Sequence, residues 1–236
     1  MNISIIVPFY NSEKTLGLCL DAATNQTKSA HEIILVDDKS DDGSVNIAKS
    51  YNVKVISLTE RSGPAVARNT GAIAATGEVL LFLDSDVVMP ANCIEKIAQN
   101  FSDKGCDAVQ TLYSPKTTYP KLATDYQQVL YTYQFMQIPE TGSSIFTTYC
   151  AAVKKDVFVK IGMFNMKIKK ASAEDAELGH LLAGNGYSIY VDKNLYVAHH
   201  TDYTFMKFFS RRHYIVRDLI KSYLQQIILI TLILLN

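Results

Sequence analysis

The sequence carries no excess of charge of either sign. Its 236 residues include 23 Lys and Arg and 23 Asp and Glu, so the formal net charge is zero. Without a basic surface field the chain lacks the attraction on which nucleic-acid binding depends, and we expect no nucleic-acid partner. Hydrophobic residues make up 48% of the chain. That fraction is enough for a sizeable core in one large domain or in two fused halves.

Cysteine is scarce, and its pattern is not that of a disulfide or zinc framework. The four cysteines are far apart and form no C-x-x-C pair: Cys19, Cys93, Cys106 and Cys150. Such a pattern is typical of reduced thiols in a cytosolic protein. We also expect no signal peptide, because the first two residues lead directly into an apolar, strand-like run. Internal repeats and flexible linkers are absent from the sequence.

A hydrophobic run long enough to cross a membrane is also lacking. The apolar run IILITLILL at residues 227–235 is short, whereas a transmembrane helix needs about 20 residues. It could be a core helix, an interfacial anchor or the first turns of a membrane segment cut off by the end of the sequence. We favour the last, because a helix that is apolar all round needs a partner or lipid.

Residues 204–223 also favour a membrane contact. Their helical pattern mixes aromatic and basic side chains: Phe205, Phe208, Phe209, Tyr214, Lys207, Arg211, Arg212 and Arg217. The segment could be an ordinary amphipathic surface helix, or a helix that lies on a membrane with its basic residues toward the headgroups. We favour the second, and expect a cytosolic catalytic part at the cytoplasmic face of a membrane.

Short apolar segments alternate with helical periodicity in the first half of the chain. Predicted strands at residues 3–7, 32–36, 53–57 and 79–83 are separated by helices at 12–23, 45–51 and 63–75, and Pro8 is expected to stop the first strand. Repeated β-α-β units predict an α/β fold with a mostly parallel central sheet flanked by helices. Beyond residue 106 we expect strands at 107–112, 147–153 and 188–192, and helices at 122–137, 154–161, 173–185 and 204–223.

Two aspartates one residue apart, Asp84 and Asp86, directly follow the apolar strand at residues 79–83. Both carboxylates therefore belong at the carboxyl end of a buried strand, where open α/β sheets bind ligands. Unneutralised carboxylates beside a core are costly, and a hard divalent cation such as Mg²⁺ or Mn²⁺ would offset that cost. Such a cation can hold a diphosphate. The alternative is a polar loop that only caps the strand, since Asp-x-Asp alone is a weak motif.

Polar residues also follow two other predicted strands. Tyr10 and Asn11 follow the first strand, and Asp37 and Asp38 follow the second. A parallel sheet brings all these strand ends to one edge. Tyr10 could pack against a nucleotide base, Asp38 could accept a hydrogen bond from a base N–H, and Asp86 could hold a metal that binds the phosphates. The set suits a nucleoside diphosphate.

Four segments stand in order within residues 4–86: SIIVPFYN at 4–11, VDDKSDDGS at 36–44, GPAVARNTG at 63–71 and FLDSD at 82–86. Together they resemble the successive motifs of family 2 glycosyltransferases with the GT-A fold. Four motifs in order are highly specific, and the resemblance continues more weakly to about residue 215. It implies the GT-A nucleotide-diphospho-sugar transferase fold, ending in C-terminal amphipathic and apolar helices.

The resemblance implies a role for each matching position in the nucleotide pocket. Pro8 and Tyr10 match residues that line this pocket, and Asn11 directly follows them. Asp38 matches the acid that reads the base, commonly uracil. Arg68 matches a basic residue near the base and the phosphates, which makes a merely solvated helix charge the weaker interpretation.

A second group of positions concerns the donor sugar and the metal. Asp84 matches the acid near the ribose and the donor sugar, with Ser85 beside it, and Asp86 matches the direct metal ligand. Val197-Ala198-His199 matches an element whose histidine can complete the metal shell or contact phosphate. The implied metal ligands are Asp86, Asp84 and His199, for Mn²⁺ or Mg²⁺. Arg212 lies where relatives carry a basic residue that can approach the diphosphate.

Glu174 and Asp175 begin the helix predicted at residues 173–185. Carboxylates at a helix start could simply interact with the helix dipole. In the family, the Glu-Asp pair at this place supplies the general base, and Asp175 resembles that base with Glu174 beside it. An acceptor hydroxyl needs such a carboxylate to take its proton as it attacks the anomeric carbon. On a strand, His199 and His200 would point to opposite faces, so we expect only one of them to enter a site easily.

The expected function is an inverting, metal-dependent glycosyltransferase in cell-surface polysaccharide or glycolipid synthesis. A UDP-sugar is the first choice of donor and GDP-mannose the second. The acceptor, a carbohydrate or polyprenyl phosphate, stays open because residues 113–146 contain no motif. One alternative is a catalytically silent module that binds nucleotide sugars or serves as a scaffold. A sugar nucleotidyltransferase is weaker, because the loop at residues 8–12 contains no glycine.

We expect three parts in the chain. Residues 1–110 form the nucleotide-sugar-binding half, and residues 111–203 form the acceptor-binding half with the catalytic base. Residues 204–236 form the amphipathic helix and the start of a membrane-associated or truncated transmembrane segment.

Overall fold

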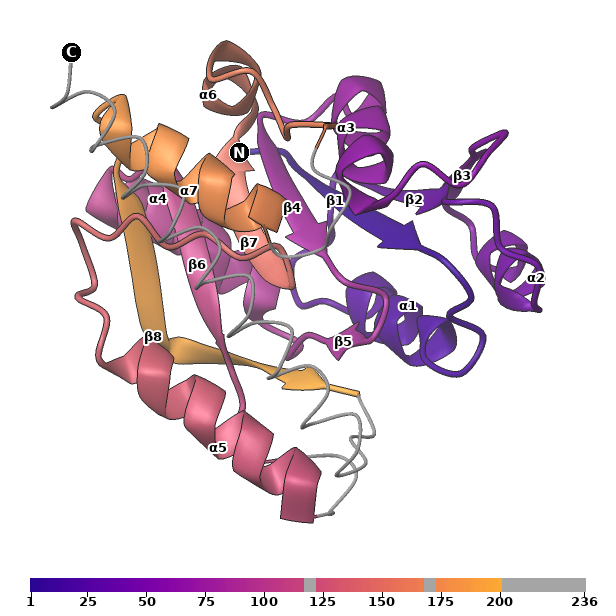
Figure 1. Ribbon diagram of the computed structural model, residues 1–236, viewed down its shortest axis with the longest axis horizontal. Coiled ribbons are helices and arrows are strands. Elements are labelled where there is room, and N and C mark those ends of the chain that lie inside the picture. Colours follow the sequence, from indigo (N-terminus) through magenta and orange to yellow (C-terminus); the bar gives the residue numbers. More distant parts are fainter. Residues whose placement is uncertain (117–121, 168–172, 201–236) are drawn as a thin grey trace, which may run out of the picture.

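The structure, a computed structural model, describes residues 1–116, 122–167 and 173–200. An eight-stranded mixed sheet of order β3-β2-β1-β4-β7-β6-β8-β5 lies between helices (Figure 1). The strands are β1 Ile3–Phe9, β2 Glu32–Asp37, β3 Lys54–Ser57, β4 Val79–Leu83, β5 Val87–Val88, β6 Ala108–Tyr113, β7 Cys150–Lys154 and β8 Ile189–His199. The helices are α1 Leu16–Thr24, α2 Ser44–Ser50, α3 Pro64–Ala74, α4 Cys93–Lys104, α5 Leu122–Met136, α6 Lys155–Lys160 and α7 Ala173–Gly184.

The first four strands are parallel, as the repeated β-α-β pattern predicts. Ile6 of β1 lies opposite Ile34 of β2 on one side and Phe82 of β4 on the other. The prediction that Pro8 stops the first strand is wrong, because β1 continues through Pro8, which lies opposite Val36. The pairing of β1 with β4 ends at Ile6, so Pro8 adjoins a single strand, where its missing N–H is tolerated.

The second half of the sheet mixes strand directions. β7 runs antiparallel between β4 and β6, β8 runs parallel to β6, and the short β5 pairs antiparallel with the end of β8. The strand predicted at residues 188–192 is too short, because β8 continues to His199 past an irregularity opposite residues 110–112. Polar residues 192–194 hide this continuation in the sequence. Two described elements, α4 and β5, are not among the predicted ones.

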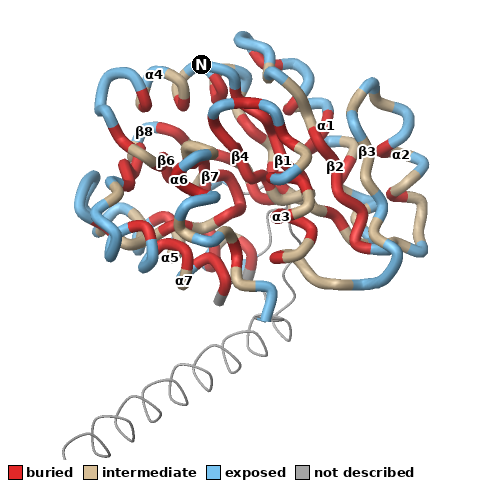
Figure 2. The backbone as a smooth tube through the Cα atoms, turned by 90° about the horizontal axis from the view of Figure 1, so that it is seen from above, coloured by how far each residue is buried: buried red, intermediate tan, exposed pale blue. Residues whose placement is uncertain are grey.

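The core lies in two layers, one on each face of the sheet. Helices α1, α2 and α4 pack on one face, where Ile5 and Leu81 are buried. Helices α3, α6 and α7 cover the other face, where Phe82 and Phe158 are buried. In Figure 2 the buried strands run through the middle and the exposed segments lie outside them. The predicted helices on both faces are therefore confirmed.

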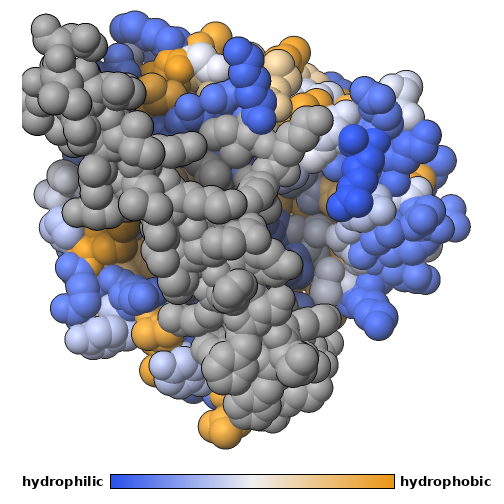
Figure 3. Space-filling view, in the orientation of Figure 1, coloured by the Kyte–Doolittle hydropathy of each residue, from blue (hydrophilic) through white to orange (hydrophobic). Residues whose placement is uncertain are grey.

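Helix α5 is turned the opposite way from an ordinary surface helix. Its fully buried side chains are polar, namely Thr124, Gln127, Gln128 and Thr132, and they lie beside the half-buried Tyr131 and Phe135, which pack on the core. Its outward side chains are apolar and at least 40% exposed: Leu122, Tyr126, Val129, Tyr133 and Met136. Figure 3 shows hydrophobic surface over α5 at the lower edge, and hydrophilic surface over α2 at the right. Hydrogen bonds therefore contribute more than usual to holding α5 on the sheet.

Two predictions for the C-terminal part of the chain are not tested by the structure. The helix predicted at residues 204–223 and the apolar run at 227–235 both lie outside the described residues. Among the helices that the structure does describe, none has the length and hydropathy needed to span a membrane. The division of the chain at residues 110 and 203 stays a prediction.

Candidate active site

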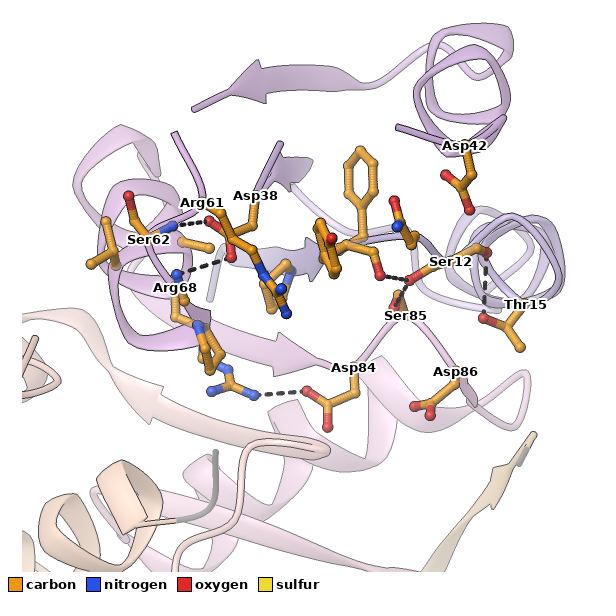
Figure 4. Close-up of a pocket in the computed structure, with 18 of the residues that line it drawn as sticks. Ser12, Thr15, Asp38, Asp42, Arg61, Ser62, Arg68, Asp84, Ser85 and Asp86 are labelled. Atoms are coloured by element: carbon orange, nitrogen blue, oxygen red, sulfur yellow. Dashed lines mark hydrogen bonds and ion pairs between the residues drawn. The ribbon is translucent and has the colours of Figure 1, made fainter. Parts of the chain in front are cut away.

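The carboxyl ends of β1, β2 and β4 open into a cavity of about 1590 Å³. The loops after these strands and the start of α3 form its walls (Figure 4). Its lining includes most of the predicted nucleotide-binding residues: Pro8, Tyr10, Asn11, Asp38, Arg68, Asp84, Ser85 and Asp86. Positions as much as 78 residues apart in the sequence thus meet at one edge of the sheet, because parallel strands end there together.

Asp38 holds the start of α3 at one end of the cavity. Its two carboxylate oxygens accept hydrogen bonds from the backbone N–H groups of Ser62 (2.7 Å) and Gly63 (2.9 Å). Gly63 has a φ of +92°, which glycine adopts without steric cost. The guanidinium carbon of Arg61 lies 4.0 Å from the ring centroid of Tyr10. Both groups that the sequence assigns to a base, Asp38 and Tyr10, are therefore engaged within the protein.

Asn11 joins the loops that follow β1 and β2. Its Nδ2 donates to Asp41 Oδ1 at 2.7 Å, and its Oδ1 accepts from the Asp41 N–H at 3.0 Å. Asn11 and Lys39 have positive φ values of 49° and 65°, which are uncommon for residues other than glycine. The hydroxyl of Ser85 lies 2.8 Å from that of Ser12 and joins the loop after β4 to the same structure. Three loops are thus fixed relative to one another.

Arg68 is buried and bridges three carboxylates. Its Nη2 lies 2.9 Å from Asp84 Oδ1, and its Nη1 lies 2.9 Å from Glu174 Oε1 and 3.8 Å from Asp175 Oδ1. Burial alone would lower the pKa of Arg68, but the three carboxylates outweigh burial and raise it. Burial raises the pKa of Glu174, and the nearby Asp175 raises it further, against the opposing effect of Arg68. Burial likewise raises the pKa of Asp84 despite its ion pair.

The two predicted catalytic residues lie behind Arg68. Glu174 is 1% exposed and Asp175 is 8% exposed, and neither is among the described residues that line the cavity. Asp175 accepts hydrogen bonds from Thr148, whose N–H lies 3.2 Å from Oδ2 and whose hydroxyl lies 2.9 Å from Oδ1. Within the described residues, Arg68 Nε and Glu174 Oε2 are buried without a hydrogen-bond partner. Arg68 is thus the link between these residues and the cavity.

Asp86 and His199 meet at the other side of Asp84. His199 Nε2 lies 3.2 Å from Asp86 Oδ2, because β5 pairs with the end of β8. The N–H of His200 donates to the Asp86 carbonyl at 2.7 Å. Both histidines therefore reach the site, although the sequence suggested easy entry for only one. Strand alternation no longer applies to His200, which follows the end of β8 and lines the cavity.

The fit of these residues to a divalent cation depends on their chemistry. Across the three described ranges, no group of three His, Cys, Asp or Glu side chains is arranged to hold a metal. Asp84 already uses Oδ1 for Arg68. Asp86, with a side chain that is 39% exposed, and His199 nevertheless form a carboxylate–imidazole pair. Such a pair suits Mn²⁺, and Mg²⁺ through the carboxylate alone, when phosphate and water oxygens supply the remaining ligands.

Sequence reasoning missed several residues of this site. Ser12 could have been identified from its position in the loop after β1, and Arg61 from its position just before the third motif. Thr148 and Gln128 gave no such signal, because they lie in or beside a stretch without a recognisable motif. Arg212, predicted near the diphosphate, lies outside the described residues.

The sheet order and the polar strand ends define a GT-A glycosyltransferase fold. The structure of S. aureus TarS 1–349 in complex with UDP-GlcNAc matches with a TM-score of 0.69 and 22% identity, covering 86% of this chain and 60% of that one. Mannosyltransferase PcManGT from Pyrobaculum calidifontis, in complex with GDP-Man and Mn²⁺, matches with a TM-score of 0.68 and 23% identity, covering 85% and 57%. At these identities the similarity establishes the fold.

Residues 4–162 match Glycosyl transferase family 2, and the chain belongs to this family. Glycosyltransferase AglE of Haloferax volcanii is 32% identical over 171 residues, which are 69% of this chain and 55% of that protein. The poly(ribitol-phosphate) beta-glucosyltransferase of Bacillus spizizenii is 49% identical over 94 residues, 36% of this chain and 15% of that protein. The chain thus spans about half of the first relative and less of the second. The resemblance carried by the four motifs is confirmed.

Proposed function

We propose that the chain is an inverting, metal-dependent glycosyltransferase that moves a sugar from a nucleotide-diphospho-sugar to an acceptor. The observation that carries this proposal is the position of Asp84 and Asp86 at one end of a cavity that has Tyr10 and Asp38 at the other. The volume of about 1590 Å³ exceeds the 300–1,000 Å³ or so of common small-ligand pockets. A nucleotide sugar and part of an acceptor therefore have room together.

In this proposal the nucleotide enters along the loops after β1 and β2. The base packs on Tyr10 and is read by Asp38, and Arg61 must leave the Tyr10 ring to admit it. A cation–π contact at an exposed site is worth about 0.5–1 kcal/mol, so this displacement is affordable within nucleotide binding. A UDP-sugar is the first choice of donor and GDP-mannose the second. Structural neighbours determined with UDP-GlcNAc and with GDP-Man support both.

The transfer step needs a base and a stabilised leaving group. The acceptor oxygen attacks the anomeric carbon from the face opposite the diphosphate, whose C–O bond breaks and leaves the electron pair on phosphate oxygen. Asp175 takes the acceptor proton, and Thr148 orients its carboxylate for this role. Glu174 holds Arg68, and Arg68 faces the developing negative charge from the cavity wall. Attack from the opposite face inverts the configuration of the sugar.

A divalent cation, Mn²⁺ or Mg²⁺, when bound would supply positive charge to the leaving diphosphate. Asp86 and His199 are the residues that would hold it, with Asp84 beside them. We further propose that the acceptor is a carbohydrate or polyprenyl phosphate, and that the protein acts at the cytoplasmic face of a membrane in surface polysaccharide or glycolipid synthesis. The names of the relatives support the polysaccharide assignment, and the apolar run at residues 227–235 supports the membrane.

Calorimetric titration of UDP, GDP and dTDP with Mn²⁺, and then with a chelator, tests the proposal. We expect one nucleotide to bind, the chelator to abolish its binding, and Asp86→Ala to have the same effect as the chelator. Asp42→Asn is the matched control, since Asp42 lines the same cavity away from Asp86. Affinity that is unchanged in Asp86→Ala would remove the metal assignment. Metal-dependent binding without any donor hydrolysis would instead indicate a silent binding module.

A further inference from the structure

His199 is held between two polar side chains from different parts of the chain. Its Nε2 lies 3.2 Å from Asp86 Oδ2, and its Nδ1 lies 3.1 Å from the amide Nε2 of Gln128 on α5. The ring of Tyr113 stacks on the imidazole at 4.8 Å and 17°. His199 is 9% exposed and Gln128 is 1% exposed, so solvent has little access to either. The imidazole plane is thus fixed, and its hydrogen-bond partners decide its protonation pattern.

The amide of Gln128 selects one tautomer of this ring. An amide NH₂ is only a donor, so Nδ1 of His199 must accept from it and carries no hydrogen. A neutral imidazole then has its hydrogen on Nε2, which donates to Asp86 Oδ2. In this state Nε2 has no lone pair to offer a cation. Meanwhile Oε1 of Gln128 is buried and accepts no hydrogen bond from the described residues.

When His199 carries its hydrogen on Nε2, the buried Oε1 of Gln128 has no hydrogen-bond donor within the described ranges. Turning the amide by half a turn brings Oε1 to Nδ1, where it would accept a hydrogen from the ring. A hydrogen on Nδ1 leaves the lone pair on Nε2, directed at the same place as the Asp86 carboxylate. Histidines that ligate metals commonly donate their other ring N–H to an oxygen in this way.

We propose that Gln128 is a positioning residue that switches His199 between two tautomers. With its NH₂ toward the ring, His199 donates to Asp86. With its carbonyl toward the ring, His199 and Asp86 both offer lone pairs to a divalent cation. The Nε2 proton passes to water and Nδ1 takes a proton from water, so the protein gains no net charge. This inference rests on the proposed function, because it assigns to Asp86 and His199 the divalent cation of that reaction.

The test measures the tautomer directly and the cation separately. Nitrogen-15 spectra of the 236-residue chain distinguish the two ring forms at about pH 8, where an ordinary imidazole is neutral. His199→Asn identifies the His199 signals among the five histidines. We expect hydrogen on Nε2 in the wild type without metal, and hydrogen on Nδ1 after the addition of Zn²⁺, a diamagnetic divalent cation that imidazole readily ligates. A ring that carries its hydrogen on the same nitrogen before and after Zn²⁺ would overturn the proposal.

Two substitutions separate positioning from folding. Gln128→Glu offers only acceptor oxygens when ionised, so it should place hydrogen on Nδ1 even without metal; an Nδ1 that carries no hydrogen in this variant would contradict the proposal. Gln128→Met should weaken Mn²⁺ binding, followed by electron paramagnetic resonance, by about 10–100-fold. Gln127→Met is the matched control, since Gln127 is the neighbouring buried glutamine of α5 and should leave Mn²⁺ affinity unchanged. Equal affinities in the two methionine variants would also overturn it.

The tautomer and Mn²⁺ measurements can fail independently, so they distinguish a failure of this inference from a failure of the proposed function. If the wild type binds no Mn²⁺ but Gln128→Glu still changes the metal-free tautomer, the metal assignment fails and control by Gln128 stands. If Mn²⁺ binds and neither Gln128 variant alters the tautomer, control by Gln128 fails and the metal assignment stands.

Discussion

Replacing Thr148 by valine should weaken both the fold and the reaction. Thr148 is fully buried, and its hydroxyl lies 2.9 Å and 3.1 Å from the two oxygens of Asp175. The hydroxyl has one hydrogen, so valine removes one charge-assisted hydrogen bond and leaves the backbone N–H in place. Hydrogen bonds to charged groups contribute about 1.5–3 kcal/mol, and we expect the free energy of unfolding to fall by that amount.

Thr111→Val provides the matched control for this measurement. Thr111 is equally buried, and its hydroxyl donates at 2.7 Å to the carbonyl oxygen of Cys150, an uncharged acceptor. A neutral hydrogen bond contributes about 0.5–1.5 kcal/mol, so urea unfolding should show a smaller loss than in Thr148→Val. The two variants remove the same atom from the same buried environment. Their difference therefore reports the charge of Asp175.

The predicted effect of Thr148→Val on the reaction can be measured without a known acceptor, as metal-dependent hydrolysis of the nucleotide-sugar donor. Thr148→Val should lower kcat while leaving the KM for the donor nearly unchanged, and Thr111→Val should alter neither. Asp175→Asn, which keeps the shape and removes the base, should bind donor and show no turnover. Equal stability losses in the two valine variants, together with unchanged kcat in Thr148→Val, would refute the assignment of Thr148 and Asp175.

Two further predictions concern the buried ion cluster. Arg68→Met should reduce the free energy of unfolding by about 3–5 kcal/mol, because it leaves buried carboxylates without their cation. Arg61→Met, which removes an exposed cation, should cost far less, and similar losses would contradict this account. Glu174 has a folded pKa raised above 4.5, so its stabilising contribution is present below that pH and is lost as the pH rises through the folded pKa. As the pH rises from about 4 to 7, the melting temperature of Glu174→Gln should therefore increase relative to that of the wild type. The opposite trend would mean that the attraction of Arg68 for the ionised carboxylate outweighs the effect of burial.

The sequence predicts well those features that depend on local pattern. The strand at residues 79–83 agrees with β4, because an apolar run stopped by Asp84 defines both its ends. The parallel order of the first strands follows from repeated β-α-β units, and it implies that the polar strand ends meet at one edge. Tyr10, Asp38 and Asp86 could therefore be assigned to one cavity from their positions after strands alone.

Features that depend on distant partners could not be predicted. Pro8 lies within β1 because β4 stops pairing at Ile6, and no local signal reports where a neighbouring strand ends. Thr148 acquires its role only when α7 places Asp175 beside it, and Gln128 only when β8 places His199 beside α5. The sequence predicts the helix at 122–137, but it does not reveal which face of this helix turns inward.

The inverted orientation of α5 reverses the usual rule of which substitutions a helix tolerates. In most surface helices, the outward polar positions tolerate substitution, whereas the inward apolar positions do not. On α5 the outward positions, such as Val129 and Tyr133, contribute little to the core and should accept polar residues freely. The inward Gln128 and Thr132 make directional contacts that a hydrophobic residue of similar size cannot replace. A scan of hydropathy along this helix would therefore rank Val129 above Gln128 and Thr132, which is the reverse of their burial.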